Sequence, residues 1–423
     1  MKRALIITYY WPPTGGSGVQ RWVKFSKYLP ELGWQPVIYT PENPEQLAVD
    51  ESLLKDVPEC AEIIKTHIRE PYEAYRALFG KKKEVNPINS QKKSFKKKLS
   101  VWIRGNFFIP DPRAGWVRPS VKYLKKYLEE HPVDVVVTTG PPQSMHLIGR
   151  GLKRATGVRW IADFRDPWTE MFYFKHLGLT KCSQRRHRRL EQTVLDEADA
   201  IISVTPLVQK DFQAKTETPV ALITNGFDED DFPALAASPC KEMFSIVHTG
   251  LFASDGNPLL LWDVLAQRCT ADVQFRKALR IRLAGKVDVE IIQAIKDRGL
   301  EDNLDLLGYL PHDKTVQEQR SADMLILPLR QEPEYRKVLP GKIFEYLAAR
   351  RPVLGIGQED GAAAAVLSDS RAGAMYDWDK KQELDNFIED CWQSHLSPEA
   401  KPAGSDIDKY TRRALAKELV KIL

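Results

Sequence analysis

The stretch 339–356, LPGKIFEYLAARRPVLGI, contains a short amphipathic segment with a proline near each end. Pro340 suits the first turn of a helix, where a backbone N–H is not needed, and Pro352 ends that helix before the apolar run 353–356. Another apolar run, 324–327, precedes the stretch. Strand, helix and strand in this order predict a right-handed crossover between parallel strands.

The same alternation extends over most of the chain. Strands are expected at 4–10, 36–39, 133–139, 159–162, 200–204 and 220–223, and again at 244–248, 279–284, 304–307, 324–327 and 353–356. Helices are expected at 119–130, 143–155 and 184–197, then at 258–269, 288–298, 312–321, 340–350 and 361–368. Two such series predict an α/β protein with two doubly wound domains.

The domain limits follow from breaks in this alternation. A polar, turn-rich stretch at 225–241 separates the series, so we expect domains at 1–232 and 243–400. A last helix, within 401–423, is expected to pack elsewhere than on the second sheet. The Pro- and Lys-rich segment 42–118 interrupts the first series and reads as an insertion.

Composition excludes several classes of protein. With 43% hydrophobic and 28% charged residues among 423, the chain is not globally disordered. Its apolar runs are shorter than the roughly 18 residues of a membrane-spanning helix. The apolar start ends at Pro12-Pro13, which favours a buried first strand and a cytoplasmic protein. Five cysteines without a C-x-x-C spacing argue against a disulfide framework and a zinc ribbon, and no metal site is predicted.

One segment carries the excess positive charge. The net charge is +5, but residues 81–104 alone contribute +8, so the chain is not a general nucleic-acid binder. Lys92–Lys98 are followed by Trp102 and Phe107, and a second basic run lies at 185–189. These residues fit a solvated loop or docking on an anionic membrane surface, and fit RNA binding less well, because no RNA-binding motif is present.

A glycine-rich loop follows the first strand. Gly16 and Gly18 allow close backbone approach at a helix N-terminus, which favours an anion, and Arg21 adds a cation nearby. The run lacks the third glycine of the dinucleotide fingerprint and is not a Walker A loop. It is either part of a ligand site that includes Gly16, Gly18 and Arg21, or a plain tight turn.

Two later strands of the first half end in polar residues. Asp163, Arg165 and Asp166 could act in catalysis by orienting hydroxyl groups or supplying a base, or could form an internal ion-pair network. Thr139, Gly140 and His146 could line the site or be structural, with His146 as a residue of a helix face.

The second half offers the most specific group. Lys342 and Glu345 lie three residues apart on one helix face, and Gly250 ends the strand 244–248. They could form a simple salt bridge. Alternatively, Lys342 and the first-turn N–H groups hold phosphates while Glu345 accepts hydrogen bonds from a ribose diol, with Gly250 allowing close approach.

Taken together, the two-domain pattern, the glycine loop, Thr224–Asp228 and Pro340–Val353 resemble the retaining glycosyltransferases of family 4, which have the GT-B fold. The resemblance implies two Rossmann-like domains facing across a cleft, with an acceptor bound by the first and a nucleotide-sugar donor mainly by the second. On this scheme Gly16, Gly18 and Arg21 would help to bind the donor, and Thr139, Gly140 and His146 would lie on the acceptor side. It implies that the last helix crosses back to the first domain, and that neither a cofactor nor a metal is needed.

The resemblance also implies a reaction. A sugar would pass from a nucleoside diphosphate to an acceptor hydroxyl with retention, attack occurring on the leaving-group face, with the departing phosphate taking the proton. A role in cell-surface polysaccharide or glycolipid assembly, on a sugar or lipid-linked acceptor, would suit a cytoplasmic protein peripheral to the inner face of a membrane.

The chain departs from the family pattern at the donor motif. Glu345 matches the second of two glutamates separated by seven residues, but Lys337 occupies the first position. The Arg and Lys that commonly follow the residue matched by Gly250 are absent, so Lys342, Arg21 or Arg336 would have to supply positive charge. A nucleotide-sugar epimerase of the same fold and an inactive nucleotide-sugar-binding scaffold therefore stay open as alternatives. A phosphorylase would need a pyridoxal-binding lysine context, which is not found.

Overall fold

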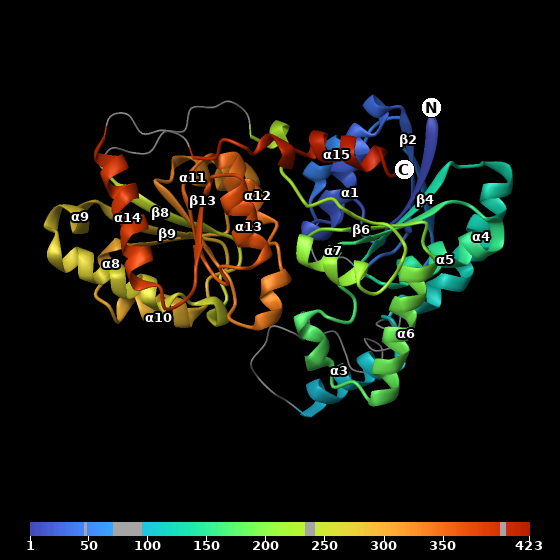
Figure 1. Ribbon diagram of the computed structural model, residues 1–423, viewed down its shortest axis with the longest axis horizontal. Helices are drawn as coiled ribbons and strands as arrows, with labels where there is room; N and C mark the ends of the chain where they lie inside the picture. The colour runs from blue at the N-terminus through green and yellow to red at the C-terminus, as the bar shows by residue number, and fades with distance from the viewer. Residues whose placement is uncertain (46–48, 71–94, 233–241, 398–402) are drawn as a thin grey trace. The chain divides into compact units, whose positions relative to one another are not determined.

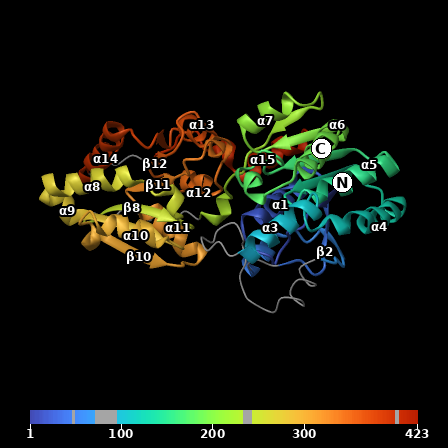
Figure 2. The ribbon, with the colours of Figure 1, turned by 90° about the horizontal axis from the view of Figure 1, so that it is seen from below.

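The computed structural model describes residues 1–45, 49–70, 95–232, 242–397 and 403–423 (Figure 1). The chain forms two units, Met1–Thr224 together with Arg412–Leu423, and Asn225–Thr411. Each unit contains one parallel β-sheet with helices on both faces, as Figures 1 and 2 show. The prediction of two doubly wound α/β domains is confirmed. The cleft expected between them stays a prediction.

The first unit has a seven-stranded sheet in the order β3-β2-β1-β4-β5-β6-β7. Its strands are β1 (Lys2–Ile7), β2 (Trp34–Pro41), β3 (Glu62–Thr66), β4 (Val135–Gly140), β5 (Trp160–Phe164), β6 (Ala200–Ser203) and β7 (Val220–Leu222). All neighbouring strands pair in parallel. The central strands are apolar on both faces, as a sheet covered by helices on each side requires.

Helices cover the two faces of this sheet unequally. They are α1 (Ser17–Tyr28), α3 (Phe95–Phe107), α4 (Val117–Glu130), α5 (Ser144–Thr156), α6 (Lys181–Glu197), α7 (Pro206–Gln213) and α15 (Arg412–Val420), with short 3-10 turns at Pro30–Leu32, Glu51–Asp56, Ala114–Trp116 and Phe172–Leu177. One core cluster joins α4, α5, α6 and α7 to the sheet, and another joins α1 and α15 to its opposite face.

The C-terminal helix belongs to the first unit. Leu415, Ala416 and Leu419 of α15 are buried in the same cluster as Trp22 of α1, and the two helices lie side by side in Figures 1 and 2. Arg413 also pairs with Glu31, which lies just beyond α1. The expected return of the last helix to the first domain is therefore confirmed.

The second unit has a six-stranded sheet in the order β10-β9-β8-β11-β12-β13. Its strands are β8 (Phe244–Thr249), β9 (Leu279–Ala284), β10 (Leu304–Gly308), β11 (Met324–Pro328), β12 (Val353–Ile356) and β13 (Gly373–Tyr376), all paired in parallel. Its helices are α8 (Leu259–Ala271), α9 (Val273–Ala278), α10 (Val289–Lys296), α11 (His312–Ser321), α12 (Lys342–Ala349), α13 (Ala362–Asp369) and α14 (Lys381–Leu396).

The helices of the second unit also divide between the faces of their sheet. One cluster contains side chains of α8, α9, α10 and α14, and another contains side chains of α12 and α13. Figures 1 and 2 show α8, α9 and α14 side by side. Short 3-10 turns lie at Glu229–Asp231, Ser254–Gly256, Glu301–Asn303, Pro333–Lys337 and Asp408–Tyr410.

Part of the segment 42–118 belongs to the sheet. β3 pairs with the edge of β2, and α4 starts at Val117. The basic segment 81–104 lies outside the described residues up to residue 94, and its remainder falls in α3. Over the described ranges, no helix is both long and apolar enough to cross a membrane.

Candidate functional site

Parallel strands bring the ends of neighbouring strands to one edge of a sheet, and ligands of open α/β sheets bind beyond that carboxyl edge. The predicted site residues gather at this edge in each unit. In the first unit these residues are Gly16, Gly18, Arg21 and those at the ends of β4 and β5. In the second unit they are Gly250, Lys342 and Glu345.

A row of three glycines forms part of the edge in the second unit. Gly250, Gly285 and Gly308 end three neighbouring strands with φ values of 95°, 107° and 64°. A Cβ atom on Gly285 would lie 2.4 Å from the carbonyl oxygen of Gly250, so no side chain fits there. The sequence analysis named only Gly250. Positive φ values and close backbone packing leave this part of the edge free of side chains.

Lys342, the first residue of α12, lies beside this glycine row. Its Nζ is 3.1 Å from His248 Nε2 and 3.4 Å from where a Cβ of Gly250 would be. Burial lowers the pKa of Lys342 to about 8. Burial, reinforced by the Lys342 charge, holds the pKa of His248 well below its usual value, so a neutral imidazole accepts the lysine hydrogen bond.

Glu345 is oriented by a buried amide. Gln319 of α11 donates from Nε2 to Glu345 Oε2 at 3.1 Å and to Thr249 Oγ1 at 2.9 Å. Among the described residues, no ion pair joins Lys342 to Glu345, so the simple salt bridge that their spacing allowed is not formed. The sequence analysis placed His248 at the end of the strand before Gly250 without giving it a role, and it missed Gln319, because nothing in their spacing marks them as partners of α12.

These residues combine three properties. The glycine row offers backbone without side chains, Lys342 offers a cation, and Glu345 offers a half-buried carboxylate on the same helix face. A diphosphate needs the first two, because its negative charge is stabilised by a cation and by close backbone approach. A ribose diol needs the third, because both of its hydroxyls can donate to one carboxylate.

In the first unit, Asp163 lies within a saturated network. Its carboxylate accepts hydrogen bonds from Arg21 Nη2 at 2.9 Å, Arg21 Nε at 3.2 Å, Trp22 Nε1 at 2.7 Å and Thr139 Oγ1 at 2.9 Å. Burial opposes ionisation of Asp163, but the Arg21 charge and these hydrogen bonds outweigh it and lower the pKa. Arg21 also donates to the carbonyls of Ile223 and Thr224. Asp163 therefore forms a buried ion pair, but its partner is Arg21 and not Arg165, the cation of its own run.

Arg165 and Asp166 differ from Asp163. Arg165 donates from Nη1 to the carbonyl of Gly18 at 2.5 Å and from Nη2 to the carbonyl of Pro141. Gly18 is needed for this contact, because a Cβ there would lie 2.8 Å from Arg165 Nη1. Asp166 is half-buried, and burial raises its pKa although the nearby Arg165 charge lowers it. Asp166 is therefore the carboxylate of this run that is not enclosed by hydrogen bonds.

His146, Gly140 and Thr139 are also brought together. His146 is fully buried, its Nδ1 is 2.9 Å from Thr138 Oγ1, and its Nε2 has no hydrogen-bond partner within the described structure. A Cβ on Gly140 would lie 2.5 Å from that Nε2. Burial lowers the pKa of His146 to about 3, so its ring is neutral. The N-terminus of α5 beside it is capped by Asp111, which accepts from Ser144 N at 2.8 Å.

The glycine loop forms the N-terminus of α1. Gly16 is the N-cap, with φ of 105°, and no side chain caps this end of the helix. No acidic residue lies in the first turn either. The loop therefore keeps the geometry that an anion would need, but its ligand role stays a prediction.

Comparison with known families gives the class of the protein. Residues 16–231, just over half of the chain, match the family described as Glycosyltransferase Family 4. The chain belongs to glycosyltransferase family 4. Residues 245–394 match a second description, Glycosyl transferases group 1. The two matches correspond to the two units, so the chain is a glycosyltransferase, and the resemblance stated above is confirmed.

Solved structures support the GT-B fold of this glycosyltransferase. Sucrose-phosphate synthase from Thermosynechococcus elongatus is 14% identical with a TM-score of 0.62, over 100% of this chain and 98% of that one. WaaG, a glycosyltransferase involved in lipopolysaccharide biosynthesis, is 14% identical with a TM-score of 0.56, over 99% of each chain. A putative UDP-N-acetylglucosamine 2-epimerase from Listeria monocytogenes is 10% identical with a TM-score of 0.55, over 99% and 95%.

Sequence comparison with curated proteins finds no match for this glycosyltransferase. At 10–14% identity, the likeness to the structural neighbours above shows the fold alone. Its substrates must therefore be inferred from its own residues.

Lys337 takes the position of the first family glutamate. It ends the turn Pro333–Lys337, in which Arg336 pairs with Asp360 at 2.9 Å. Arg330, just before this turn, pairs with Asp255 at 2.8 Å. The turn of this glycosyltransferase thus carries a cation where the family motif carries an acid, and the nearby Arg330 and Arg336 each have a carboxylate partner.

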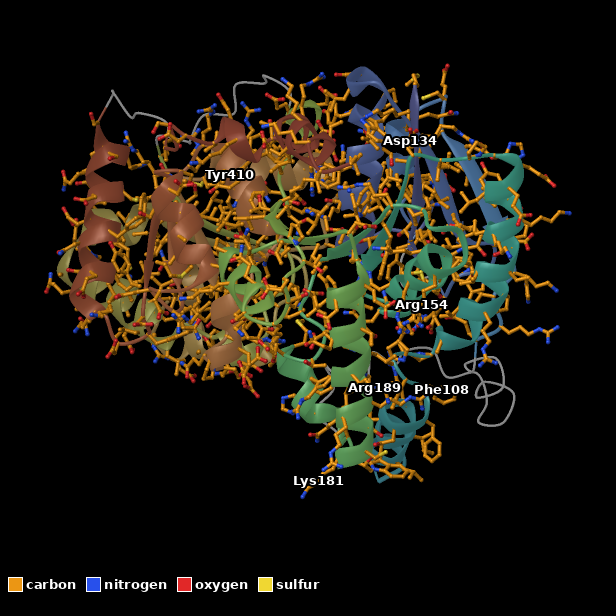
Figure 3. The ribbon with its side chains drawn as sticks, turned by 45° about the vertical axis from the view of Figure 1, so that its right-hand side comes forward. Phe108, Asp134, Arg154, Lys181, Arg189 and Tyr410 are labelled. Atoms are coloured by element: carbon orange, nitrogen blue, oxygen red, sulfur yellow. The ribbon has the colours of Figure 1, made fainter. Side chains whose placement is uncertain are left out.

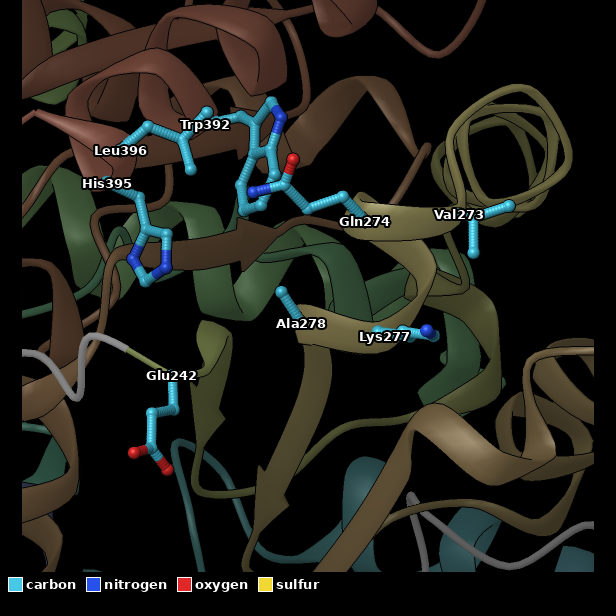
Figure 4. Close-up of a pocket in the computed structure, with 8 residues that line it drawn as sticks. All are labelled: Glu242, Val273, Gln274, Lys277, Ala278, Trp392, His395 and Leu396. Atoms are coloured by element: carbon cyan, nitrogen blue, oxygen red, sulfur yellow. The ribbon is translucent and has the colours of Figure 1, made fainter.

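A pocket of about 450 Å³ lies elsewhere in the second unit (Figure 4). It is lined by Glu242, Val273, Gln274, Lys277, Ala278, Trp392, His395 and Leu396. Glu242 lies two residues before β8 and Ala278 directly before β9, so this pocket is at the amino edge of the sheet, opposite to Gly250. His395 Nδ1 is held 2.9 Å from Asp323 Oδ1. Within the second unit, the pocket is therefore separate from Gly250, Lys342 and Glu345.

Proposed function

We propose that this glycosyltransferase moves a sugar from a nucleoside diphosphate sugar to an acceptor hydroxyl with retention of the anomeric configuration. The observation that carries the proposal is the grouping of Lys342, Glu345 and the glycine row at the carboxyl edge of the second sheet. In this proposal Lys342 binds the diphosphate, Glu345 accepts hydrogen bonds from the ribose, and Gly250 allows the phosphate to approach the backbone.

The first unit would orient the acceptor. Asp166, which is half-buried and not enclosed by hydrogen bonds, is the polar group best suited to contact hydroxyls, whereas His146 is fully buried behind Gly140 and would support this edge from inside. Arg165 holds the glycine loop through Gly18, and the Arg21–Asp163 pair holds α1 against β5. We therefore infer a contact role for Asp166, and positioning roles for Asp163, Arg21, Arg165 and, through its bond to Asp163, Thr139.

The chemistry needs no enzyme nucleophile in this scheme. The bond between the anomeric carbon and the phosphate oxygen breaks, a bond to the acceptor oxygen forms on the same face, and the acceptor proton passes to the leaving phosphate. Negative charge grows on that phosphate as the bond breaks, and a fixed cation stabilises it most at that moment. Lys342 is that cation here, and we propose that transfer requires no metal.

A panel of nucleotide sugars tests the donor assignment. Thermal unfolding is measured with each compound, and a ligand at 100 times its dissociation constant should stabilise the protein by about 2.7 kcal/mol. The stabilising donor is then tested by calorimetry with Glu345→Ala, for which we expect at least about tenfold weaker binding, because the ribose loses hydrogen bonds to a charged group. Unchanged affinity would remove Glu345 from the site. Transfer to added acceptors, with the product anomer assigned by NMR, tests retention.

The same assay separates two alternatives. An epimerase would change the sugar of the donor without any acceptor, and the Listeria monocytogenes neighbour is described as such an enzyme. A scaffold would bind the donor and never turn it over. This alternative is motivated by Lys337, which stands in place of the family glutamate. Transfer to an acceptor that depends on Glu345 excludes both.

The affinity for the donor should depend on pH through Lys342. Its pKa of about 8 means that the free enzyme loses this proton above about pH 8, whereas the diphosphate binds only the protonated form. We expect the dissociation constant to be constant below about pH 8 and to rise up to about tenfold per unit above it. Calorimetry across this range checks the prediction, and Lys342→Met should show no such rise.

The pathway is inferred more broadly. WaaG is described as acting in lipopolysaccharide biosynthesis, and an acceptor of that class would be carried on a lipid. We propose that the protein extends a cell-surface polysaccharide or glycolipid precursor, from the cytoplasm, at the inner face of a membrane.

A further inference from the structure

Helix α3 is fixed to the beginning of α6 in the first unit. Asn106 donates from Nδ2 to the carbonyl of Gly178 at 3.3 Å, and its Oδ1 accepts from the backbone N–H of Thr180 at 2.8 Å. Thr180 is the N-cap of α6. A Cβ on Gly105 would lie 2.7 Å from Leu179 Cδ2, so α3 also contacts this connection closely. Figures 1 and 3 show α3 beside the first turns of α6.

The outer face of α3 is apolar and exposed. Leu99, Trp102, Ile103 and Phe107 are 45%, 39%, 40% and 69% exposed. Their spacing of three and four residues puts them on one face of the helix. The rings of Trp102 and Phe107 contact each other at a centroid distance of 5.8 Å. Single exposed apolar residues are ordinary, but a stripe along one helix marks a surface that contacts something.

The first turns of α6 add positive charge. Its exposed cations are Lys181, Arg185, Arg186, Arg188 and Arg189, two of which, Lys181 and Arg189, are labelled in Figure 3. Within the described part of the chain, no ion pair involves any of these four arginines. His187, between them, faces inward, where its Nδ1 accepts from Trp168 Nε1 at 3.1 Å. The arginine run is therefore a solvated, unneutralised surface.

We propose that the apolar face of α3 and the arginine run of α6 together form a docking surface for an anionic phospholipid bilayer. Trp and Phe side chains enter the interfacial region of a bilayer, and each Lys or Arg near an anionic surface strengthens the attraction. Unpaired cations beside an exposed apolar stripe favour this partner over an acidic protein. RNA is less well matched, because its recognition uses aromatic platforms that stack bases. The idea that docking brings a lipid-linked acceptor within reach rests on the proposed function. The docking itself does not depend on it.

Vesicle flotation tests the surface with the full chain and no substrate. The wild type is mixed with vesicles of phosphatidylcholine, or of phosphatidylcholine with about one-third phosphatidylglycerol. Changing Arg185, Arg186, Arg188 and Arg189 to Gln should weaken partitioning onto the anionic vesicles by at least about tenfold. In the matched control, four exposed cations of α4 are changed to Gln: Arg118, Lys122, Lys125 and Lys126. This control should reduce partitioning onto the anionic vesicles by less than about twofold.

The apolar face is tested separately by Ile103→Ser with Phe107→Ser, which should also weaken partitioning, and do so equally at high salt. The proposal is overturned if the wild type does not bind anionic vesicles, or if the α4 control loses as much as the α6 variant. It is also overturned if pure phosphatidylcholine binds equally well, or if RNA but not lipid binds in a parallel assay. An α6 variant that loses vesicle binding yet transfers sugar to a soluble acceptor would leave the proposed function intact.

Discussion

Replacing Lys342 by Met should weaken donor binding about 10- to 100-fold and, at the same time, make the donor-free protein more stable. The loss of affinity follows because the diphosphate no longer receives a hydrogen bond from a charged group. The gain follows from burial, which lowers the pKa of Lys342 to about 8, so the folded protein holds an unfavourable charge at neutral pH. Calorimetry with the donor and thermal unfolding without it measure the two effects.

The sign of the stability effect depends on pH. Because the folded pKa lies below that of the unfolded chain, the unfolded state binds more protons between about pH 8 and 10.5, and wild-type stability from this group rises across that interval. The advantage of Lys342→Met, about 1–3 kcal/mol at neutral pH, should therefore shrink above about pH 8. Lys381→Met is the matched control, since Lys381 is the exposed first residue of α14. A variant that is less stable than wild type at pH 7 would contradict the argument.

Breaking the Arg21–Asp163 pair should have the largest effect on stability. Asp163→Ala leaves the Arg21 guanidinium buried without its carboxylate, and such a change typically costs about 3–5 kcal/mol. Trp22 and Thr139 also lose their acceptor. Urea unfolding, followed by a probe in the first unit, should show an earlier transition there, while the transition of the second unit stays in place.

A double variant checks that the two residues act as a pair. Arg21→Met combined with Asp163→Ala should cost less than the sum of the single changes, because neither charge is then left alone. The exposed Glu129→Ala on α4 serves as a neutral control. If Asp163→Asn keeps full stability but abolishes transfer, then Asp163 acts on substrate and its role in the ion pair is secondary.

The fold was largely predictable because its strands are apolar runs separated by helices of ordinary length. The edges were not. β3 (Glu62–Thr66) and β13 (Gly373–Tyr376) are short edge strands, each paired on one side only, and their residues do not form the continuous apolar runs of buried strands. Whether such residues form a strand depends on their pairing with a neighbouring strand, and a short window of sequence does not reveal that pairing.

The sequence predicted the site residues that lie at the ends of strands. The strand-end position of Asp163 was foreseen, but its enclosure was not, although the period of two along β5 puts it on the same side as Ile161, which packs in the cluster of α1. His248 and Gln319 could not be foreseen, since they meet α12 only through the order of strands in the sheet. Gly285 and Gly308 could have been suspected, because each follows or ends a predicted strand.

The packing of α15 on α1 has a consequence for biosynthesis. The first unit consists of two stretches of chain that are separated by the whole of the second unit. While the ribosome is still translating the second unit, the nascent first unit has its sheet but lacks the helix that covers Trp22 and its neighbours. An apolar strip of the growing polypeptide therefore stays open to chaperones until α15 emerges from the ribosome, so the first unit is completed only after the second unit has been translated.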